Sequence, residues 1–213
     1  LHDKYKDLPF LINDKRYWNF GEFFNEAYNL SNSLCNLSKK KIGLCSDNSE
    51  FLILAMMAAW MQKRIVIPLN PRLPPKQKDQ LLKKVKCDVI FSENYIPKDF
   101  QSQEIRELPR LNLENWSTII FTSGSSGFPK AVVHTLANHF FSALGSNKII
   151  KLKPGDRWLL SLPLFHVGGL AIFFRSMLSG SSIVTPEKNK SLFENIEKNN
   201  ITHLSGYQVI PLG

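Results

Sequence analysis

Short apolar and β-branched runs alternate with helix-like segments along this chain. Residues 41–46 form a short apolar run, residues 51–61 form a longer apolar stretch, and residues 64–70 return to a β-branched pattern. Together they predict a βαβ unit. An amphipathic pattern over 76–86 and an apolar run over 88–93 repeat the alternation. Because parallel strands need a crossover that is usually a helix, the sequence predicts an α/β fold of mainly parallel sheets flanked by helices.

The same alternation resumes after a polar, proline-containing segment at 94–115. We expect a subdomain boundary there, which gives an N-terminal α/β subdomain over 1–110 and a second α/β subdomain over 111–213. The strands predicted after the boundary are 117–123, 130–135, 157–163, 181–186 and 201–207, and the predicted helices are 136–147, 170–180 and 190–200.

Polar side chains mark two of the predicted helix starts. Asp47 and Glu50 have the spacing of a capping box before the apolar helix. Thr135 is placed to cap the helix at 136–147. Three apolar residues of that helix have the spacing of a stripe facing the core, and they are Phe140, Phe141 and Leu144.

The composition supports a globular protein in a reducing environment. With 213 residues, 43% of them hydrophobic, the chain can bury a core as one domain or two small ones. Its three cysteines form no close pair and no C-x-x-C motif, which favours a cytoplasmic location over a disulfide framework or a zinc site. The longest apolar run, 51–61, is shorter than the roughly 20 residues of a membrane span. We therefore expect no stable insertion in a membrane.

The net charge of +9 raises the alternative of a non-enzymatic domain that binds nucleic acid. The basic residues are scattered, and their densest groups lie at 39–41 and 76–86, the second of which fits the solvated face of a helix. No interleaved aromatic residues accompany them. We expect no nucleic-acid partner, and a salt-dependent gel shift would test this expectation.

One loop carries the clearest chemical signal. The stretch FTSGSSGFPKAVVHT, residues 121–135, places hydroxyl residues, glycines and a lysine between two strand-like runs. Glycines let successive N–H groups point the same way, so such a loop is suited to a polyphosphate. The candidate phosphate-binding residues are Thr122, Ser123, Gly124, Ser125, Ser126, Gly127 and Lys130. A strand follows the lysine, whereas a Walker A loop leads into a helix, which argues against a kinase-type site. The residues alone leave a surface hairpin open.

The loop resembles the phosphate-binding signature of the adenylate-forming superfamily, the acyl-CoA synthetases and their AMP-binding relatives. It matches the pattern [YF]-T-S-G-[ST]-[ST]-G-x-P-K at every specified position. PLNPRLPP and LPLFHVGGL resemble two further segments of that superfamily, and the second of these is the aromatic and histidine turn at its acyl pocket. KAVVHT and WLLSLPLFHVGG are most similar to the o-succinylbenzoate-CoA ligases of menaquinone synthesis. A general fatty-acid or aryl acid-CoA ligase is the alternative within the superfamily.

The resemblance implies a two-step reaction with ATP, Mg²⁺ and CoA. The carboxylate attacks the α-phosphate to give an acyl-adenylate, and the CoA thiol then displaces AMP. The loop would orient the β and γ phosphates, and Lys130 would add positive charge. His166 would be catalytic and bind substrate where the carboxylate meets the α-phosphate, while Gly168 and Gly169 would leave room for the acyl group. The resemblance identifies no metal ligands in this sequence, and it leaves undecided whether the protein forms a homodimer.

The remaining candidates receive structural interpretations. A lone histidine in an apolar stretch is usually a core residue, and we expect this of His134 and His139. Arg175 is expected at an exposed helix end, with contact to an anionic substrate or CoA as the alternative. The superfamily's later motifs and its C-terminal lid domain are absent from this sequence, so the resemblance implies the N-terminal part of the large AMP-binding domain, an inactive fragment.

Overall fold

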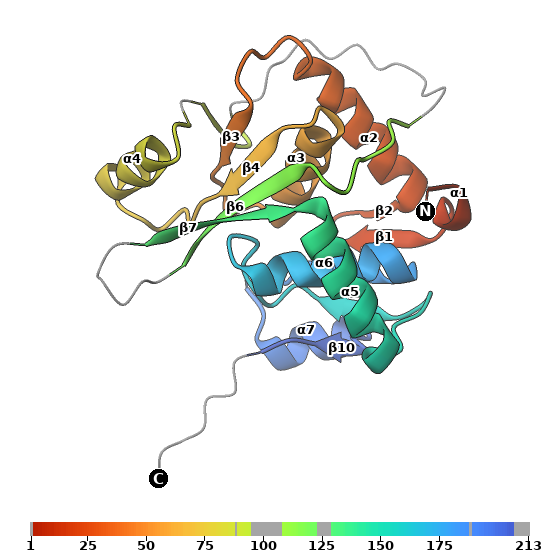
Figure 1. The fold of residues 1–213 in the computed structure, drawn as a ribbon. Helices are drawn as coiled ribbons and strands as arrows, with labels where there is room; N and C mark the ends of the chain where they lie inside the picture. Colours follow the sequence, from red (N-terminus) through yellow and green to blue (C-terminus); the bar gives the residue numbers. More distant parts are fainter. Residues whose placement is uncertain (1, 88, 95–107, 123–128, 188, 207–213) are drawn as a thin grey trace.

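The computed structural model describes residues 2–87, 89–94, 108–122, 129–187 and 189–206. These residues form two five-stranded sheets with helices between them and on their outer faces (Figure 1). Six of the strand pairs are parallel and two are antiparallel, β1 with β2 and β6 with β7. The predicted α/β fold of mainly parallel sheets is confirmed.

Sheet B contains the predicted βαβ unit and the strands on both sides of the glycine-rich loop. Its strands, in spatial order, are β5 (Ile90–Phe91), β3 (Lys41–Leu44), β4 (Ile65–Pro68), β6 (Trp116–Thr122) and β7 (Lys130–Thr135). β6 and β7 pair in antiparallel register up to Thr122 opposite Lys130, which fixes both ends of the intervening loop.

Sheet A joins the two ends of the chain. Its order is β10 (His203–Leu204), β8 (Arg157–Leu159), β9 (Ser182–Val184), β1 (Pro9–Ile12) and β2 (Tyr17–Asn19). β1 and β2 were not predicted from the sequence, nor were the helices α1 (His2–Tyr5) and α2 (Phe20–Ser33). Each sheet takes strands from both sides of residue 110, and the predicted subdomain division stays a prediction.

Five helices follow α2: α3 (Ser49–Met61), α4 (Pro75–Lys84), α5 (Leu136–Ile150), α6 (Val167–Ser179) and α7 (Leu192–Lys198). α3 and α5 pack on one face of sheet B, and α2 and α6 pack on sheet A. The two layers of helices touch, because α2 contacts α3 and α5 contacts α6. α3 is apolar on all sides and buried, as a helix enclosed between layers must be. None of the described helices is long and apolar enough to span a membrane.

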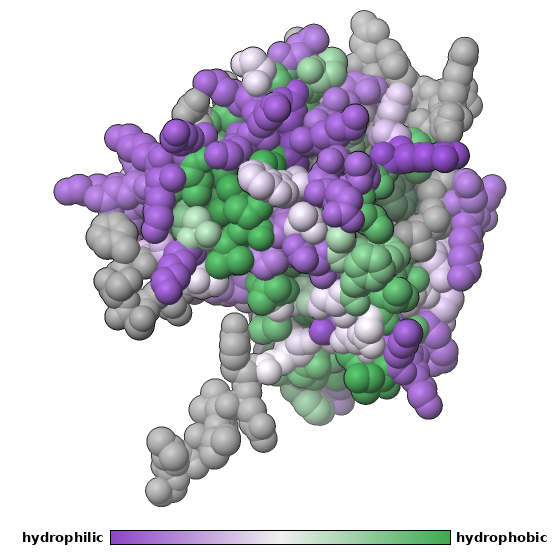
Figure 2. Space-filling model, viewed as in Figure 1, coloured by the Kyte–Doolittle hydropathy of each residue, from purple (hydrophilic) through white to green (hydrophobic). Residues whose placement is uncertain are grey.

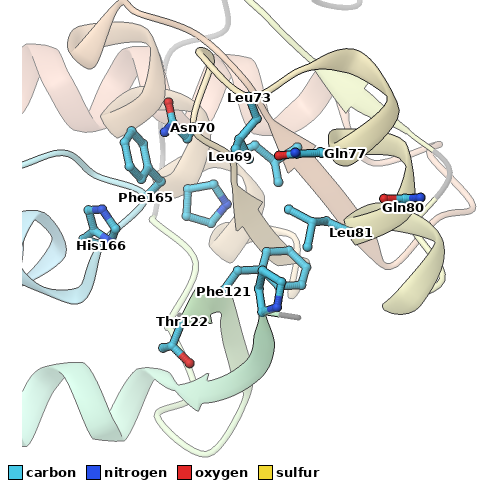
Figure 3. Close-up of a pocket in the computed structure, with 12 residues that line it drawn as sticks. Leu69, Asn70, Leu73, Gln77, Gln80, Leu81, Phe121, Thr122, Phe165 and His166 are labelled. Atoms are coloured by element: carbon cyan, nitrogen blue, oxygen red, sulfur yellow. The ribbon is translucent and has the colours of Figure 1, made fainter. Parts of the chain in front are cut away.

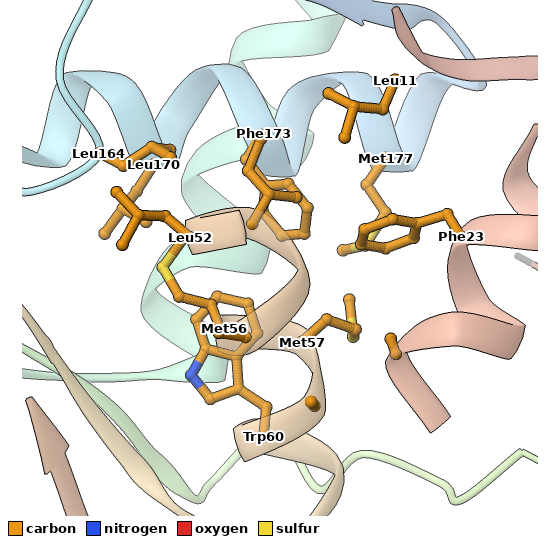
Figure 4. Packing of buried hydrophobic residues seen from close by; sticks show 14 of the residues in the cluster. Leu11, Phe23, Leu52, Met56, Met57, Trp60, Leu164, Leu170, Phe173 and Met177 are labelled. Carbon is orange, nitrogen blue, oxygen red and sulfur yellow. The ribbon is translucent and has the colours of Figure 1, made fainter. Parts of the chain in front are cut away.

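Two hydrophobic cores hold these layers together. The larger lies between the sheets, where Met56 and Trp60 of α3 meet Phe173 of α6 and Phe23 of α2 (Figure 4). The smaller lies under α4 on the outer face of sheet B and includes Ile119. The two faces of β6 therefore contribute to different cores.

Two local predictions about helices are wrong. The N-cap of α3 is Asn48, whose side chain accepts from the Phe51 N–H, and not Asp47. In α5 the residues that face the core are Leu136, His139 and Ala143, whereas Phe141 and Leu144 are exposed. His139 therefore takes one of the inward positions of α5, which the spacing of apolar residues did not predict.

His139 is a buried histidine held by β6 and α6. Thr118 Oγ1 lies 2.6 Å from His139 Nε2, and the His139 ring stacks on Phe174 with centroids 4.9 Å apart. Burial, followed by the nearby His134, lowers the pKa of His139 to about 4. The expected structural role of His139 agrees with this environment, and the imidazole is neutral in the folded protein at pH 7.

Acidification is expected to destabilise the fold through His139. Its folded pKa lies below the unfolded value of 6.5, so its contribution is constant above pH 6.5 and is lost as the pH falls toward 4. Between pH 7.5 and 4.5 this removes about 2.5 kcal/mol of the free energy of unfolding. Urea unfolding of wild type and His139→Gln at both pH values measures it. An equal pH dependence in the two proteins would contradict the prediction.

Candidate functional site

A cavity of about 470 Å³ opens at the carboxyl ends of β4 and β6. Its walls come from the turn after β4, from α4, from the ends of β6 and β7, and from the loop before α6 (Figure 3). Crevices at the carboxyl ends of parallel strands are the usual ligand sites of α/β folds, and this volume suits a small molecule. The cavity joins three of the segments that the sequence analysis had singled out.

His166 lies on the wall formed by the loop before α6. It is the N-cap residue of α6, and its carbonyl accepts from the Gly169 N–H at 3.1 Å. Its side chain makes no capping bond, so the exposed ring is available to the cavity. Figure 3 shows His166 across the opening from the residues of α4, with Thr122 at the end of β6. The cavity thus brings His166 together with Thr122, while its chemical role stays a prediction.

The predicted phosphate loop borders the same cavity. Thr122 and Pro129, which flank it on both sides, line the cavity. Ser123, Gly124, Ser125, Ser126 and Gly127 lie outside the described residues. Lys130 is exposed at the start of β7 and is not a lining residue. A second lysine stands beside it, because Lys84 Nζ donates to the Pro129 carbonyl at 2.7 Å.

Gly168 and Gly169 lie in the first turn of α6, which begins at Val167 and not at the predicted residue 170. Neither lines the cavity. A Cβ atom on Gly169 would lie 2.2 Å from the Pro163 carbonyl oxygen, whereas one on Gly168 would meet only the end of the Leu162 side chain, at 2.8 Å. Gly169 therefore allows α6 to pack against the backbone that carries His166, and a role at the acyl pocket stays a prediction for both.

The residues that complete the cavity include polar and aromatic side chains that were not named as candidates from the sequence. Asn70, Gln77, Gln80 and Phe165 line it with His166. Asn70 and Phe165 also line a second cavity of about 370 Å³, which lies at the ends of β3, β4, β8 and β9. Asn70 could have been noted, because it belongs to the PLNPRLPP turn. The glutamines carry no such signal, since they resemble any polar helix face.

The remaining basic and imidazole candidates lie elsewhere. Arg175 is half-buried in α6 with its guanidinium 5.4 Å from the centroid of the Trp158 ring, so its predicted exposed helix end is wrong. Burial lowers the pKa of Arg175. His134 is partly buried beside His139, and burial lowers its pKa as well. These three side chains pack inside the described fold and do not line the cavity.

The cavity suits an anion better than a metal ion. Its described lining residues include hydroxyl, amide and imidazole groups and no carboxylate that would repel a phosphate. Within the described part of the chain, no group of three or more His, Cys, Asp or Glu side chains could hold a metal ion.

Comparisons with known proteins agree with this fold. The family described as AMP-binding enzyme matches residues 2–209. The 2-succinylbenzoate–CoA ligase of Bacillus pumilus is 30% identical and covers 99% of this chain, which in turn covers 48% of that protein. A Staphylococcus aureus protein of the same name is 24% identical over 88% of this chain and 47% of its own length. The chain thus spans about half the length of these curated relatives.

Solved structures share the arrangement of the sheets. The o-succinylbenzoate coenzyme A synthetase of Bacillus subtilis, in complex with AMP, has a TM-score of 0.85 at 23% identity, covering 97% of this chain and 60% of that one. The N-terminal subdomain of Klebsiella oxytoca NpsA has a TM-score of 0.82 at 20% identity, covering 95% and 57%. At such identities these structures show the fold alone. Because the family match covers nearly the whole sequence, the chain belongs to the AMP-binding enzyme family.

Proposed function

We propose that this chain carries the first half of an ATP-dependent acid-CoA ligase that activates o-succinylbenzoate as an acyl-adenylate and transfers it to CoA. The observation that carries the proposal is the shared cavity of His166, Thr122 and Pro129. The phosphate-loop signature and the histidine turn are distant in sequence, and a reaction at an α-phosphate needs both on one side of the reacting atoms.

Different residues of the site contribute different interactions to the proposed reaction. Residues 122–127 and Lys130 bind the β and γ phosphates of ATP, whose magnesium ion neutralises part of their charge. His166 donates a hydrogen bond where negative charge develops between the carboxylate and the α-phosphate. Apolar side chains such as Leu69, Leu81 and Phe121 line the cavity and exclude water from the reacting atoms.

The acyl substrate is inferred from the relatives. The curated proteins from Bacillus pumilus and Staphylococcus aureus are named for 2-succinylbenzoate, and the segments KAVVHT and WLLSLPLFHVGG are most similar to that group of ligases. A fatty-acid or aryl acid-CoA ligase is the alternative within the family. The cytoplasmic location, the absence of a nucleic-acid partner and the oligomeric state stay predictions.

A chimera tests the proposal. This chain is joined to the part of the Bacillus pumilus relative that it does not cover, and acid-dependent pyrophosphate exchange and CoA thioester formation are measured with o-succinylbenzoate, benzoate and dodecanoate. We expect activity with o-succinylbenzoate in the chimera and none in the 213 residues alone, because the proposal assigns closure of the site to the part of the relatives that these residues do not cover.

The other possible results of the chimera experiment test different parts of the proposal. Activity with benzoate or dodecanoate but not o-succinylbenzoate would retain the ligase class and replace the substrate. No activity in a folded chimera, under conditions in which the full Bacillus pumilus protein is active, would overturn the proposed function. Thioester formation by the short chain would show that the second half is dispensable.

A further inference from the structure

Three basic segments of the sequence meet at one edge of sheet B. They are residues 39–41, where β3 begins, residues 63–64, which precede β4, and residues 83–86, which end α4 and precede β5. Because β5 and β4 both pair with β3 in parallel, the residues before these strands lie at the same end of the sheet. The segments are separate in the sequence, and the fold brings them together.

Hydrogen bonds hold the three segments against one another. Lys41 Nζ donates to the Val85 carbonyl at 2.6 Å, which joins the start of β3 to the end of α4. Arg64 Nη1 donates to the Lys39 carbonyl at 2.5 Å, which joins the residues before β4 to those before β3. Both acceptors are backbone carbonyls without a net charge, so these bonds fix the shape of the edge and leave its positive charge in place.

Most of the excess positive charge of the chain lies in these segments. They hold eight basic residues and no acidic residue, and the formal charge of the whole chain is +9. Lys84 turns away to the Pro129 carbonyl beside the cavity. Figure 2 shows hydrophilic residues over α4 and over the segment that enters β3. We call the other seven residues the basic edge, and they are Lys39, Lys40, Lys41, Lys63, Arg64, Lys83 and Lys86.

The basic edge has no apolar anchor. All of its lysines except Lys41 are exposed, and none of the large exposed apolar residues in the described part of the chain lies in the three segments. Protein interfaces are centred on aromatic or apolar anchors and are poor in lysine. The basic edge therefore lacks what a protein partner would need.

A nucleic acid is also disfavoured as the partner. Proteins read base edges chiefly with arginine, and they hold single strands by stacking bases on aromatic side chains. The basic edge contains one arginine, Arg64, and its guanidinium donates to the carbonyls of Leu34 and Lys39. The three segments contain no aromatic residue. Charge is thus the main property that the basic edge offers to a partner.

We propose that the basic edge docks this protein on the surface of a membrane that contains anionic lipids. Lipid head groups require no apolar anchor, and clusters of about four to eight lysines and arginines are typical of such contacts. Each lysine near the surface raises the partition coefficient about fivefold. Because no apolar side chain of the basic edge can enter the hydrocarbon region, the contact is electrostatic and reversible and involves no insertion.

The docked protein keeps its cavity open to the solution. β4 begins beside the basic edge at Ile65 and ends at Pro68, and Pro68 and Leu69 line the cavity. The membrane contact and the cavity therefore lie at opposite ends of sheet B. Docking requires no ATP or acyl substrate, so this proposal does not depend on the proposed function.

Sedimentation with vesicles tests the proposal. This chain is mixed, at about 0.1 M salt, with vesicles of phosphatidylcholine alone and with vesicles that also contain about 30% phosphatidylglycerol. We expect binding to the vesicles with phosphatidylglycerol and none to phosphatidylcholine alone. Binding should weaken at least about tenfold at about 0.5 M salt, because salt screens the charges.

Two matched triple substitutions locate the contact. Lys40→Gln, Lys63→Gln and Lys86→Gln together remove one charge from each segment and should lower the partition coefficient about 100-fold. The control triple removes the same charge from exposed lysines outside the basic edge, and it should change the coefficient less than about fivefold. Its substitutions are Lys6→Gln, Lys15→Gln and Lys148→Gln. All six side chains are exposed, so folding measured by circular dichroism should not change.

Three results would overturn the proposal. The first is equal or absent binding to the two kinds of vesicle. The second is an equal loss of binding in the two triple variants, which would assign the contact to net charge and not to the basic edge. The third is complete release of the chain from the vesicles by RNA at an equal concentration of phosphate groups, which would make a nucleic acid the preferred partner.

Discussion

Replacing His166 with alanine in the chimera is expected to lower acid-dependent pyrophosphate exchange by about 100- to 1000-fold. This is the usual effect of removing one preorganised donor from a site where charge develops. His166 lies at the cavity with Thr122, and its ring has no capping bond that would assign it to helix stability instead. The loss should fall on the maximal rate more than on the KM for ATP, because the donor acts at the transition state.

Comparison with His166→Asn separates the loss of a hydrogen-bond donor in the reaction from a loss of stability at the start of α6. Asparagine keeps a hydrogen-bond donor and is a good N-cap residue, so this variant should fold at least as well as wild type and recover part of the activity. Thermal unfolding of both variants is the control. Full exchange activity in a folded His166→Ala protein would remove His166 from the proposed reaction.

Gly169→Ala is expected to destabilise the fold by about 3 kcal/mol, at the upper end of the usual cost of overpacking. The added Cβ would lie 2.2 Å from the Pro163 carbonyl oxygen and 2.7 Å from that of Leu162. Both are backbone atoms, so the loop that carries His166 must move with them. Urea unfolding of the 213-residue chain measures the change in the free energy of unfolding.

Two other helical glycines serve as controls for this prediction. Gly145, in the middle of α5, has no atom within 4 Å of a built Cβ, so Gly145→Ala should stabilise the protein by about 0.5 to 1 kcal/mol. Gly168→Ala meets only the flexible end of Leu162 and should be nearly neutral. A Gly169→Ala protein as stable as wild type would show that the Leu162 and Pro163 backbone yields readily.

The parts of the fold that sequence reasoning found are those with a local signal. The all-round apolar pattern of α3 and the β-branched run of β4 identified a buried crossover unit without knowledge of its neighbours. β1 and β2 were missed because they are short, and β1 becomes a strand by pairing with β9 far along the chain. Periodicity also misjudged α5, because the spacing of apolar residues does not predict that His139 faces the core and contacts Thr118.

The candidate site also consists of residues that a local sequence signal identifies and residues that it does not. The phosphate-loop residues and His166 belong to contiguous motifs, so a single stretch of sequence was enough to nominate them. The cavity that joins them depends on which strand ends meet, and pattern alone does not assign Asn70 or Phe165 to it. Arg175 was misplaced because its guanidinium lies over the Trp158 ring, a contact with another element that the pattern of α6 does not reveal.

β1 lies inside sheet A and pairs with β9, a strand that is synthesised much later, so sheet A cannot form until most of the chain has been made. The Pro9 carbonyl accepts a hydrogen bond from Ser182, 173 residues later. At about 5 to 20 residues per second, the β1–β2 hairpin waits roughly 10 to 35 s after its own synthesis before β9 exists to pair with it. For that interval the apolar edge of β1 stays unpaired on one side, so a chaperone that binds nascent chains is expected to protect the β1–β2 hairpin until β9 is made.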